Sequence, residues 1–123
     1  VETMAPLILK EVADGNLSLQ RFIDMTTANP ARIFGIAGKG MMEEGFDADI
    51  AFFDMGARRV IHGHELHSKA GWTPYEGLEA IFPMAVMQRG RLLLDGKEFL
   101  GKRGSGKFIK GRGYARGRPK EPI

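Results

Sequence analysis

The feature that most constrains the fold is the stretch 29–54, which leads from a helix start through a glycine-rich crossing into an apolar strand. Asn29 can cap a helix, and Pro30 suits its first turn because the missing N–H costs nothing there. Gly35 ends this short helix. The turns of the crossing are marked by Gly38, Gly40 and Gly45, where other residues would be strained. The run DIAFFD at 49–54 predicts a buried strand.

Short helices are expected before this stretch. Thr3 can cap a first helix, which stops at Asp14-Gly15-Asn16. Ser18 is a good cap for a second helix, whose apolar face ends with Met25. These helices carry more apolar surface than they can bury alone, so they are expected to need a further packing partner.

Short strands and one long loop are expected after the stretch. Residues 58–61 predict a second short strand, and residues 62–82, which lack a clear periodicity, predict a long ordered loop. Paired strands are expected at 83–89 and 91–95. Asp95-Gly96 is a strong turn signal, and residues 97–100 predict a short return strand.

Charge and composition limit the class of protein. Residues 1–101 carry 10 Lys/Arg and 14 Asp/Glu, a net charge of −4, whereas residues 102–123 carry 8 Lys/Arg and one Glu, a net charge of +7, giving +3 for the chain. Zero cysteines exclude disulfides and thiolate chemistry. No apolar run reaches the ~20 residues that span a membrane. The N-terminus lacks a signal pattern, which predicts a cytoplasmic location.

Four motifs within residues 2–77 and a fifth segment at 84–109 match one family. The matching residues are Glu2, Thr3, Pro6 and Leu7; Asn29, Pro30, Ala31, Phe34 and Gly35; Glu44, Gly45, Ala48, Asp49 and Ile50; and His67, Ser68, Lys69, Gly71, Pro74, Glu76 and Gly77. The segment 84–109 adds an RG, a DG and a closing GxxGxG pattern. Together they resemble the amidohydrolase superfamily and, within it, the C-terminal portion of dihydroorotases.

The resemblance implies an incomplete α+β fold. Residues 1–35 would be the last helices of a TIM-type barrel, residues 36–109 part of a small β-sandwich containing the 62–82 loop, and residues 110–123 a basic tail. In the family, strands from the N-terminus of the same chain complete the sandwich. The expected partners are therefore the missing N-terminal barrel portion and, through uncovered strand edges and an uncovered apolar helix face, a second copy of the chain.

The resemblance also implies a function in pyrimidine biosynthesis. Dihydroorotases cyclise N-carbamoyl-aspartate to dihydroorotate with zinc, which polarises a carbonyl and activates water. The family's zinc ligands and aspartate base lie on earlier barrel strands that have no counterpart here. No catalytic, cofactor-binding or metal residue is therefore assigned, no cofactor is expected in this chain, and the chain alone is expected to be structural and not catalytic.

All three histidines lie in the predicted loop. His62 and His64 have HxH spacing and, with His67, could form a small zinc or nickel site, although a solvated loop that happens to hold histidines is the favoured interpretation. His67 and Lys69 are expected to brace the loop against the barrel, with a role in substrate access as the alternative. Trp72 and Tyr75, two other aromatic residues of the loop, are expected to be packing residues and not stacking platforms.

The basic segment 102–123 offers a rival function. Closely spaced Arg and Lys with glycine could follow a nucleic-acid backbone through charge alone. No RNP-type motif or zinc finger accompanies it. A solvated tail, or a patch that meets an acidic surface, is the other interpretation.

Overall fold

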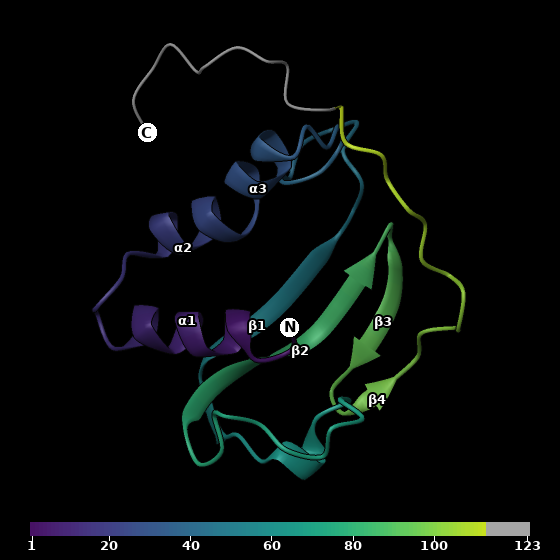
Figure 1. Cartoon of the computed structure of the whole chain (residues 1–123). Coiled ribbons are helices and arrows are strands. Elements are labelled where there is room, and N and C mark those ends of the chain that lie inside the picture. The colour runs from purple at the N-terminus through teal and green to yellow at the C-terminus, as the bar shows by residue number, and fades with distance from the viewer. Residues whose placement is uncertain (113–123) are drawn as a thin grey trace.

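The computed structural model describes residues 1–112, in which three helices precede a single antiparallel sheet (Figure 1). The helices are α1 (Met4–Ala13), α2 (Leu19–Thr26) and α3 (Ala28–Ile33), and a 3-10 turn η1 (Gly63–Glu65) lies within the long loop. The strands are β1 (Ile50–Val60), β2 (Glu79–Gln88), β3 (Arg91–Asp95) and β4 (Glu98–Phe99), paired in the order β1-β2-β3-β4. The α+β class is confirmed, whereas a barrel origin for the helices stays a prediction.

A side-chain cap explains where one of the helices, α2, begins. The Ser18 hydroxyl accepts a hydrogen bond from the backbone N–H of Arg21 at 3.2 Å, as an N-cap does. The predicted cap at Asn29 is wrong. Only Thr27 separates α2 from α3, and Thr27 has already left helical geometry, so α3 starts one residue before Asn29. The Asn29 side chain instead accepts a bond from the Arg32 guanidinium at 3.3 Å.

The two short strands predicted at 49–54 and 58–61 form one long strand, β1, interrupted by a bulge. Phe53 pairs with Pro83, but the next pair is Arg58 with Ile81, so residues 54–57 of β1 have no partner in β2. Pro83 has no N–H to donate at this point of the ladder. Asp54 stabilises the bulge by accepting the Gly56 N–H at 2.9 Å.

The prediction of a buried strand at 49–54 is wrong. Most β1 residues are exposed, because β1 is the edge strand of the sheet and the helices cover only part of it. The long loop also ends earlier than predicted, since β2 begins at Glu79 and not near Pro83. The 91–95 strand and the Asp95-Gly96 turn are confirmed, and Gly96 has the positive φ, 58°, that such a turn needs.

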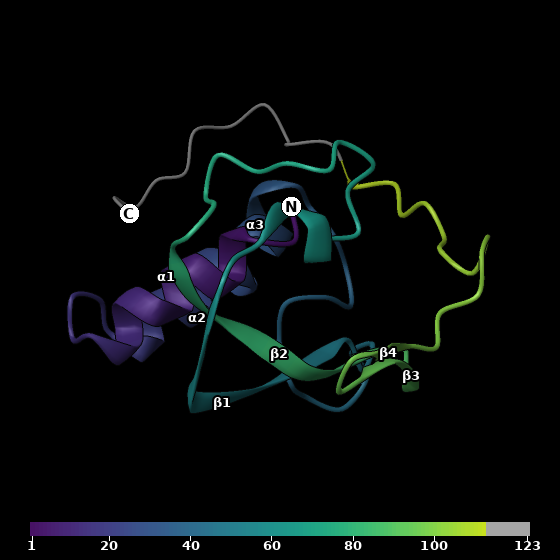
Figure 2. The same cartoon turned by 90° about the horizontal axis from the view of Figure 1, so that it is seen from below.

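A small apolar core joins α1 and α2 to β2. Leu9, Phe22 and Ile81 form its centre, and Leu9 and Ile81 are only 2% and 0% exposed. Figure 2, turned by 90°, shows the helices lying over one end of β1 and β2, while β3 and β4 extend beyond them. The helical layer therefore covers only part of the single sheet.

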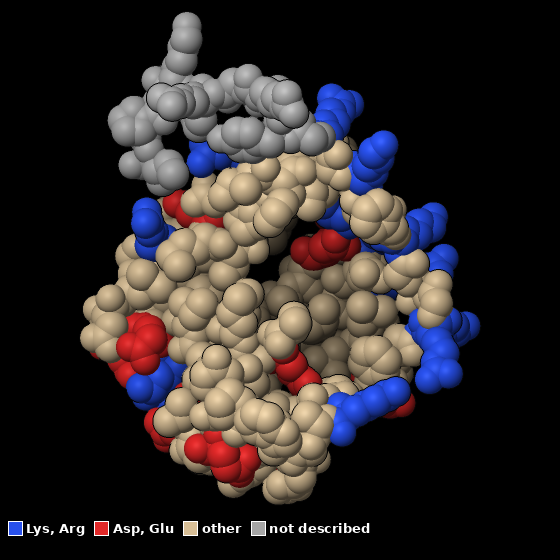
Figure 3. All heavy atoms as spheres, in the orientation of Figure 1, with Lys and Arg blue, Asp and Glu red and all other residues tan. Residues whose placement is uncertain are grey.

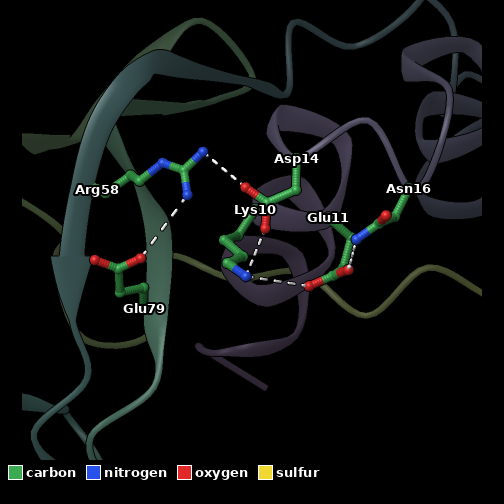
Figure 4. Close-up of polar contacts among 6 residues, drawn as sticks. All are labelled: Lys10, Glu11, Asp14, Asn16, Arg58 and Glu79. Carbon is green, nitrogen blue, oxygen red and sulfur yellow. Dashed lines mark hydrogen bonds and ion pairs between the residues drawn. The ribbon is translucent and has the colours of Figure 1, made fainter.

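An ionic network reinforces the covered end. Asp14, at the C-terminus of α1, accepts bonds from Lys10 at 2.6 Å and from the Arg58 guanidinium at 2.7 Å (Figure 4). Arg58 also lies 3.8 Å from Glu79 of β2, and Glu11 accepts a bond from Asn16 at 2.8 Å. Lys10 and Arg58 hold the pKa of the Asp14 carboxyl below its usual range. The network therefore links α1 to both strands of the ladder.

Outside the covered end, the surface has a hollow and many exposed apolar side chains. Figure 3 shows a hollow between the helices and the sheet. The most exposed large apolar residues include Leu19, Ile33, Phe34, Met42, Phe52, Met84, Phe99 and Phe108. Contiguous exposed apolar surface marks an interaction site more often than a free surface. Among the described residues, no helix is long and apolar enough to cross a membrane.

Candidate functional site

The best candidate for a functional site is the loop between β1 and β2, residues 61–78, here called the closed loop. Its two ends pair with each other, since the Ile61 N–H donates to the Leu78 carbonyl at 2.8 Å and the Gly77 N–H donates to the Ile61 carbonyl at 2.9 Å. Ile61 is 1% exposed and anchors the base of the loop. The ends of the loop meet and its interior is internally bonded, so it is held in one place on the sheet, and loops positioned by a rigid scaffold often carry function.

Glu76 holds one side of the closed loop together. Its carboxylate lies 2.9 Å from the His62 ring nitrogen and accepts the Gly63 backbone N–H at 2.6 Å. The Gly63 N–H, and after it His62, lower the pKa of the Glu76 carboxyl. Gly63 lies so close to the opposite side of the loop that an added Cβ would stand 2.8 Å from the Trp72 Cα. The loop therefore requires both the carboxylate and the glycine.

Glu2 fastens the other side of the closed loop to the segment before α1. Its two carboxylate oxygens each lie 2.9 Å from a nitrogen of His67, one from the backbone N–H and one from the ring. The two residues are 65 positions apart in the sequence. A shallow hollow opens beside this pair, lined in part by Thr3, Trp72 and Tyr75. Two motifs from distant parts of the chain thus meet through a single carboxylate.

The three histidines do not form a metal site. The His62 and His64 rings stack with centroids 5.6 Å apart, but His67 lies beside Phe99 and is bonded to Glu2. Within residues 1–112, no group of three His, Asp or Glu side chains gathers in a way that could hold a metal ion. The zinc or nickel alternative is therefore not supported by the geometry, and the residues present do not fit the zinc that the family resemblance implies.

Other residues of the loop show mixed outcomes. His67 does brace the loop, although against the segment before α1, and the predicted barrel contact is not tested. Lys69 is exposed and makes no ion pair with any residue among 1–112. The packing role predicted for Trp72 is wrong within the described chain, since Trp72 is 68% exposed and Tyr75 is 41% exposed. No apolar layer in this part of the chain covers them.

Sequence reasoning missed the two carboxylates that organise the site. Glu2 and Glu76 enter the sequence analysis only as residues that match the family motifs, and no structural role is predicted for either of them. A signal was available, because each acid belongs to a motif that resembles the family, and a carboxylate has two oxygens that can accept strong hydrogen bonds from loop N–H groups and histidines. Both carboxylates are engaged in binding the loop, so the arrangement can hold a loop in place but offers no base next to a nucleophile.

The basic segment gains no support as a nucleic-acid site. Residues 113–123 lie outside the described residues, and residues 102–112 have no helix or strand. The rival function predicted from charge is not supported.

Comparison with known proteins gives the family. The sequence model of the Amidohydrolase family matches residues 1–92. A dihydroorotase from Methanosarcina mazei is 42% identical over 115 residues, which are 92% of this chain and 25% of that protein. A D-hydantoinase from Ralstonia pickettii is 33% identical over 116 residues, 93% of this chain and again 25% of the relative.

The fold agrees with the same family. The solved structure of a D-hydantoinase (dihydropyrimidinase) from Thermus sp. superposes with a TM-score of 0.85 at 29% identity, covering 89% of this chain and 25% of that one. The chain therefore spans about a quarter of the length of the relatives it matches. The resemblance to dihydroorotases predicted from the motifs is confirmed, and the chain belongs to the amidohydrolase family.

Proposed function

We propose that this chain is the C-terminal, structural segment of a dihydroorotase-like amidohydrolase, which cyclises N-carbamoyl-aspartate to dihydroorotate in pyrimidine biosynthesis. The observation that carries the proposal is the meeting of Glu2 with His67, which joins two dihydroorotase-like motifs. The higher identity to the dihydroorotase, 42% against 33% for the D-hydantoinase, favours this reaction within the family.

In this proposal the segment positions the rest of the enzyme and does not perform chemistry. The helices would close the end of the barrel, and the sheet would form part of the small sandwich beside it. The closed loop, fixed by Glu2 and Glu76, would brace the junction between the two. The zinc of the whole enzyme would be bound outside residues 1–112, because these residues bring no suitable ligands together.

A domain replacement tests this proposal. The matching quarter of the Methanosarcina mazei dihydroorotase would be replaced by this chain, and dihydroorotase activity, metal content and thermal melting would be measured. We expect the chimera to fold, to bind metal and to retain activity. The same replacement in the Ralstonia pickettii D-hydantoinase, assayed for D-hydantoinase activity, is the matched control. We expect this chimera to retain a smaller fraction of its parent's activity.

Two outcomes would overturn the proposal. A chimera that folds and binds metal normally but lacks dihydroorotase activity would show that this segment belongs to a different enzyme. Dihydroorotase activity of the isolated 123-residue chain would show that its role is not structural.

We also propose that the isolated chain self-associates through its uncovered apolar residues. Leu19, Ile33 and Phe34 are 52%, 50% and 65% exposed on the helices, and Met84 is 53% exposed on the sheet. Light scattering after size-exclusion chromatography should show a mass that rises with concentration. A constant 13.6 kDa species over a hundredfold range of concentration would contradict it.

A further inference from the structure

The tip of the β2–β3 hairpin contains an unusual arginine. Arg89 has φ 48°, and within residues 1–112 it is the one residue other than glycine with a positive φ. Together with Gly90, at φ 72°, it forms a two-residue turn in which both central residues are left-handed. Such turns favour Asn-Gly or Asp-Gly, and a side chain as long as arginine is uncommon there. A strained residue suggests a role outside the turn itself.

The backbone of this turn binds the start of β1. The Arg89 N–H donates to the Asp49 carboxylate at 2.8 Å, and the Gly90 N–H donates to the Ala48 carbonyl at 3.0 Å. Asp49 also pairs with Lys39 of the glycine-rich crossing. Burial opposes ionisation of Asp49, but Lys39 and the Arg89 N–H more than offset it and hold the pKa of Asp49 below its usual range. The left-handed turn is thus fixed by its surroundings.

The Arg89 side chain reaches a different part of the chain. Its guanidinium donates to the Ser105 backbone carbonyl at 2.8 Å, in a half-buried position. Ser105 lies in the middle of residues 100–112, here called the strap, which has no helix or strand. Figure 1 shows the strap running from β4 past the hairpin tip toward the helices.

The ends of the strap are fixed to opposite layers of the fold. At its start, the Leu100 N–H donates to the Leu93 carbonyl of β3 at 2.8 Å. At its end, the Arg112 N–H donates to the Gly35 carbonyl, just after α3, at 2.9 Å. An added Cβ at Gly111 would stand 2.0 Å from the Phe34 carbonyl oxygen, so the strap lies tightly against this turn.

We propose that Arg89 is a positioning residue that fastens the strap to the hairpin and thereby fixes the helices relative to the far end of the sheet. The hydrogen bond to Ser105 joins the turn between β2 and β3 to the middle of the strap. Without it, a segment of this length would be held only near its two ends. This role does not depend on the proposed enzymatic function, because it concerns the internal order of the chain.

Hydrogen exchange on the full 123-residue chain tests the proposal with a substitution that suits the turn. Arg89→Asn keeps a residue that tolerates the left-handed conformation but removes the guanidinium. Arg91→Asn, in the same hairpin, is the matched control for loss of charge. We expect Arg89→Asn to speed exchange of the Ser105 and Arg112 N–H groups about tenfold, the size expected for losing a hydrogen bond from a charged group. Exchange within the β2–β3 ladder should stay unchanged.

Three results would overturn the proposal. The first is unchanged exchange of both strap N–H groups in Arg89→Asn. The second is equal acceleration in Arg91→Asn, which would assign the effect to net charge. The third is loss of folding in both Arg89→Asn and Arg89→Gly, since glycine satisfies the turn without strain, and unfolding would place Arg89 in the stability of the whole fold and not of the strap.

Discussion

At one end of the β1–β2 ladder the strands lie beneath α1, and at the other the β2–β3 hairpin extends beyond the helices. The covered end buries Leu9 and Ile81 almost completely and adds the ionic network of Asp14 and Arg58. The hairpin end leaves Met84 53% exposed and Phe99 61% exposed, and is tied instead by Arg89 and Asp49. One end is held by burial and the other by polar contacts.

This difference fits the proposed role of the chain as a segment of a longer enzyme. Polar contacts fix geometry but contribute little net stability, whereas burial of apolar area contributes most of it. A region that is ordered by polar contacts but leaves its apolar side chains exposed is therefore expected where another part of a protein packs against those side chains. The chain as a whole superposes on solved D-hydantoinase structures, of which it covers only about a quarter. We therefore expect substitutions at the two ends to have unequal effects.

The largest effect is expected at the covered end. Ile81→Ala removes a side chain that is 0% exposed and should lower the free energy of unfolding by about 2–5 kcal/mol. Met84→Ala, on the same strand but half exposed, is the control and should change it by about 0.5 kcal/mol. Urea denaturation followed by circular dichroism measures both. Equal losses at the two positions would remove the distinction between the two ends.

A smaller effect is expected in the closed loop, which joins the two strands at the covered end. Gly63→Ala would bring a Cβ within 2.8 Å of the Trp72 Cα, and relief of this overlap should cost about 1–3 kcal/mol of unfolding free energy. Gly106→Ala meets no atom within 4 Å and serves as the control. If the two variants have the same thermal midpoint, the close approach of Gly63 to the Trp72 backbone does not contribute to the stability of the loop.

The smallest effect is expected for the ionic network. Asp14→Asn removes the acceptor for Lys10 and Arg58 and should destabilise the chain less than Gly63→Ala. Because the folded pKa of Asp14 is below its usual 3.8, its contribution is fully present above that pH and is lost as the pH falls through the folded value. Unfolding curves of the wild type and Asp14→Asn should therefore differ at pH 6 and converge toward pH 2. A difference that persists in acid would contradict a role for the carboxylate charge.

Local signals predicted much of the fold. Ser18 as a cap, the glycine-rich crossing and the Asp95-Gly96 turn depend on residues near in sequence, and they lie where the sequence indicated. The predicted cap at Asn29 is wrong because α2 and α3 are separated by a single residue, Thr27, which therefore occupies the N-cap position of α3. The sequence predicts two strands, 49–54 and 58–61, where the structure has one, because a bulge and a turn interrupt an apolar run in the same way.

Burial and the site were harder to predict. An apolar run indicates what a strand can bury, but β1 is an edge strand and its exposure depends on what lies beside it. The pairing of Glu2 with His67 joins residues 65 positions apart, and no periodicity connects them. Glu2 and His67 each match a family motif, but the motifs do not predict that the two side chains meet, and their contact is seen only in the folded chain.

The bulge of β1 has a consequence for how the chain behaves among its own copies. An exposed edge strand can recruit a strand from another molecule and begin aggregation, and an 11-residue edge is long enough to do so. Residues 54–57 interrupt the regular backbone pattern of that edge. Only short regular runs remain on either side, and Arg58 and Arg59 place positive charge beside one of them. The irregularity opposite Pro83 thus opposes strand addition at the β1 edge of the sheet.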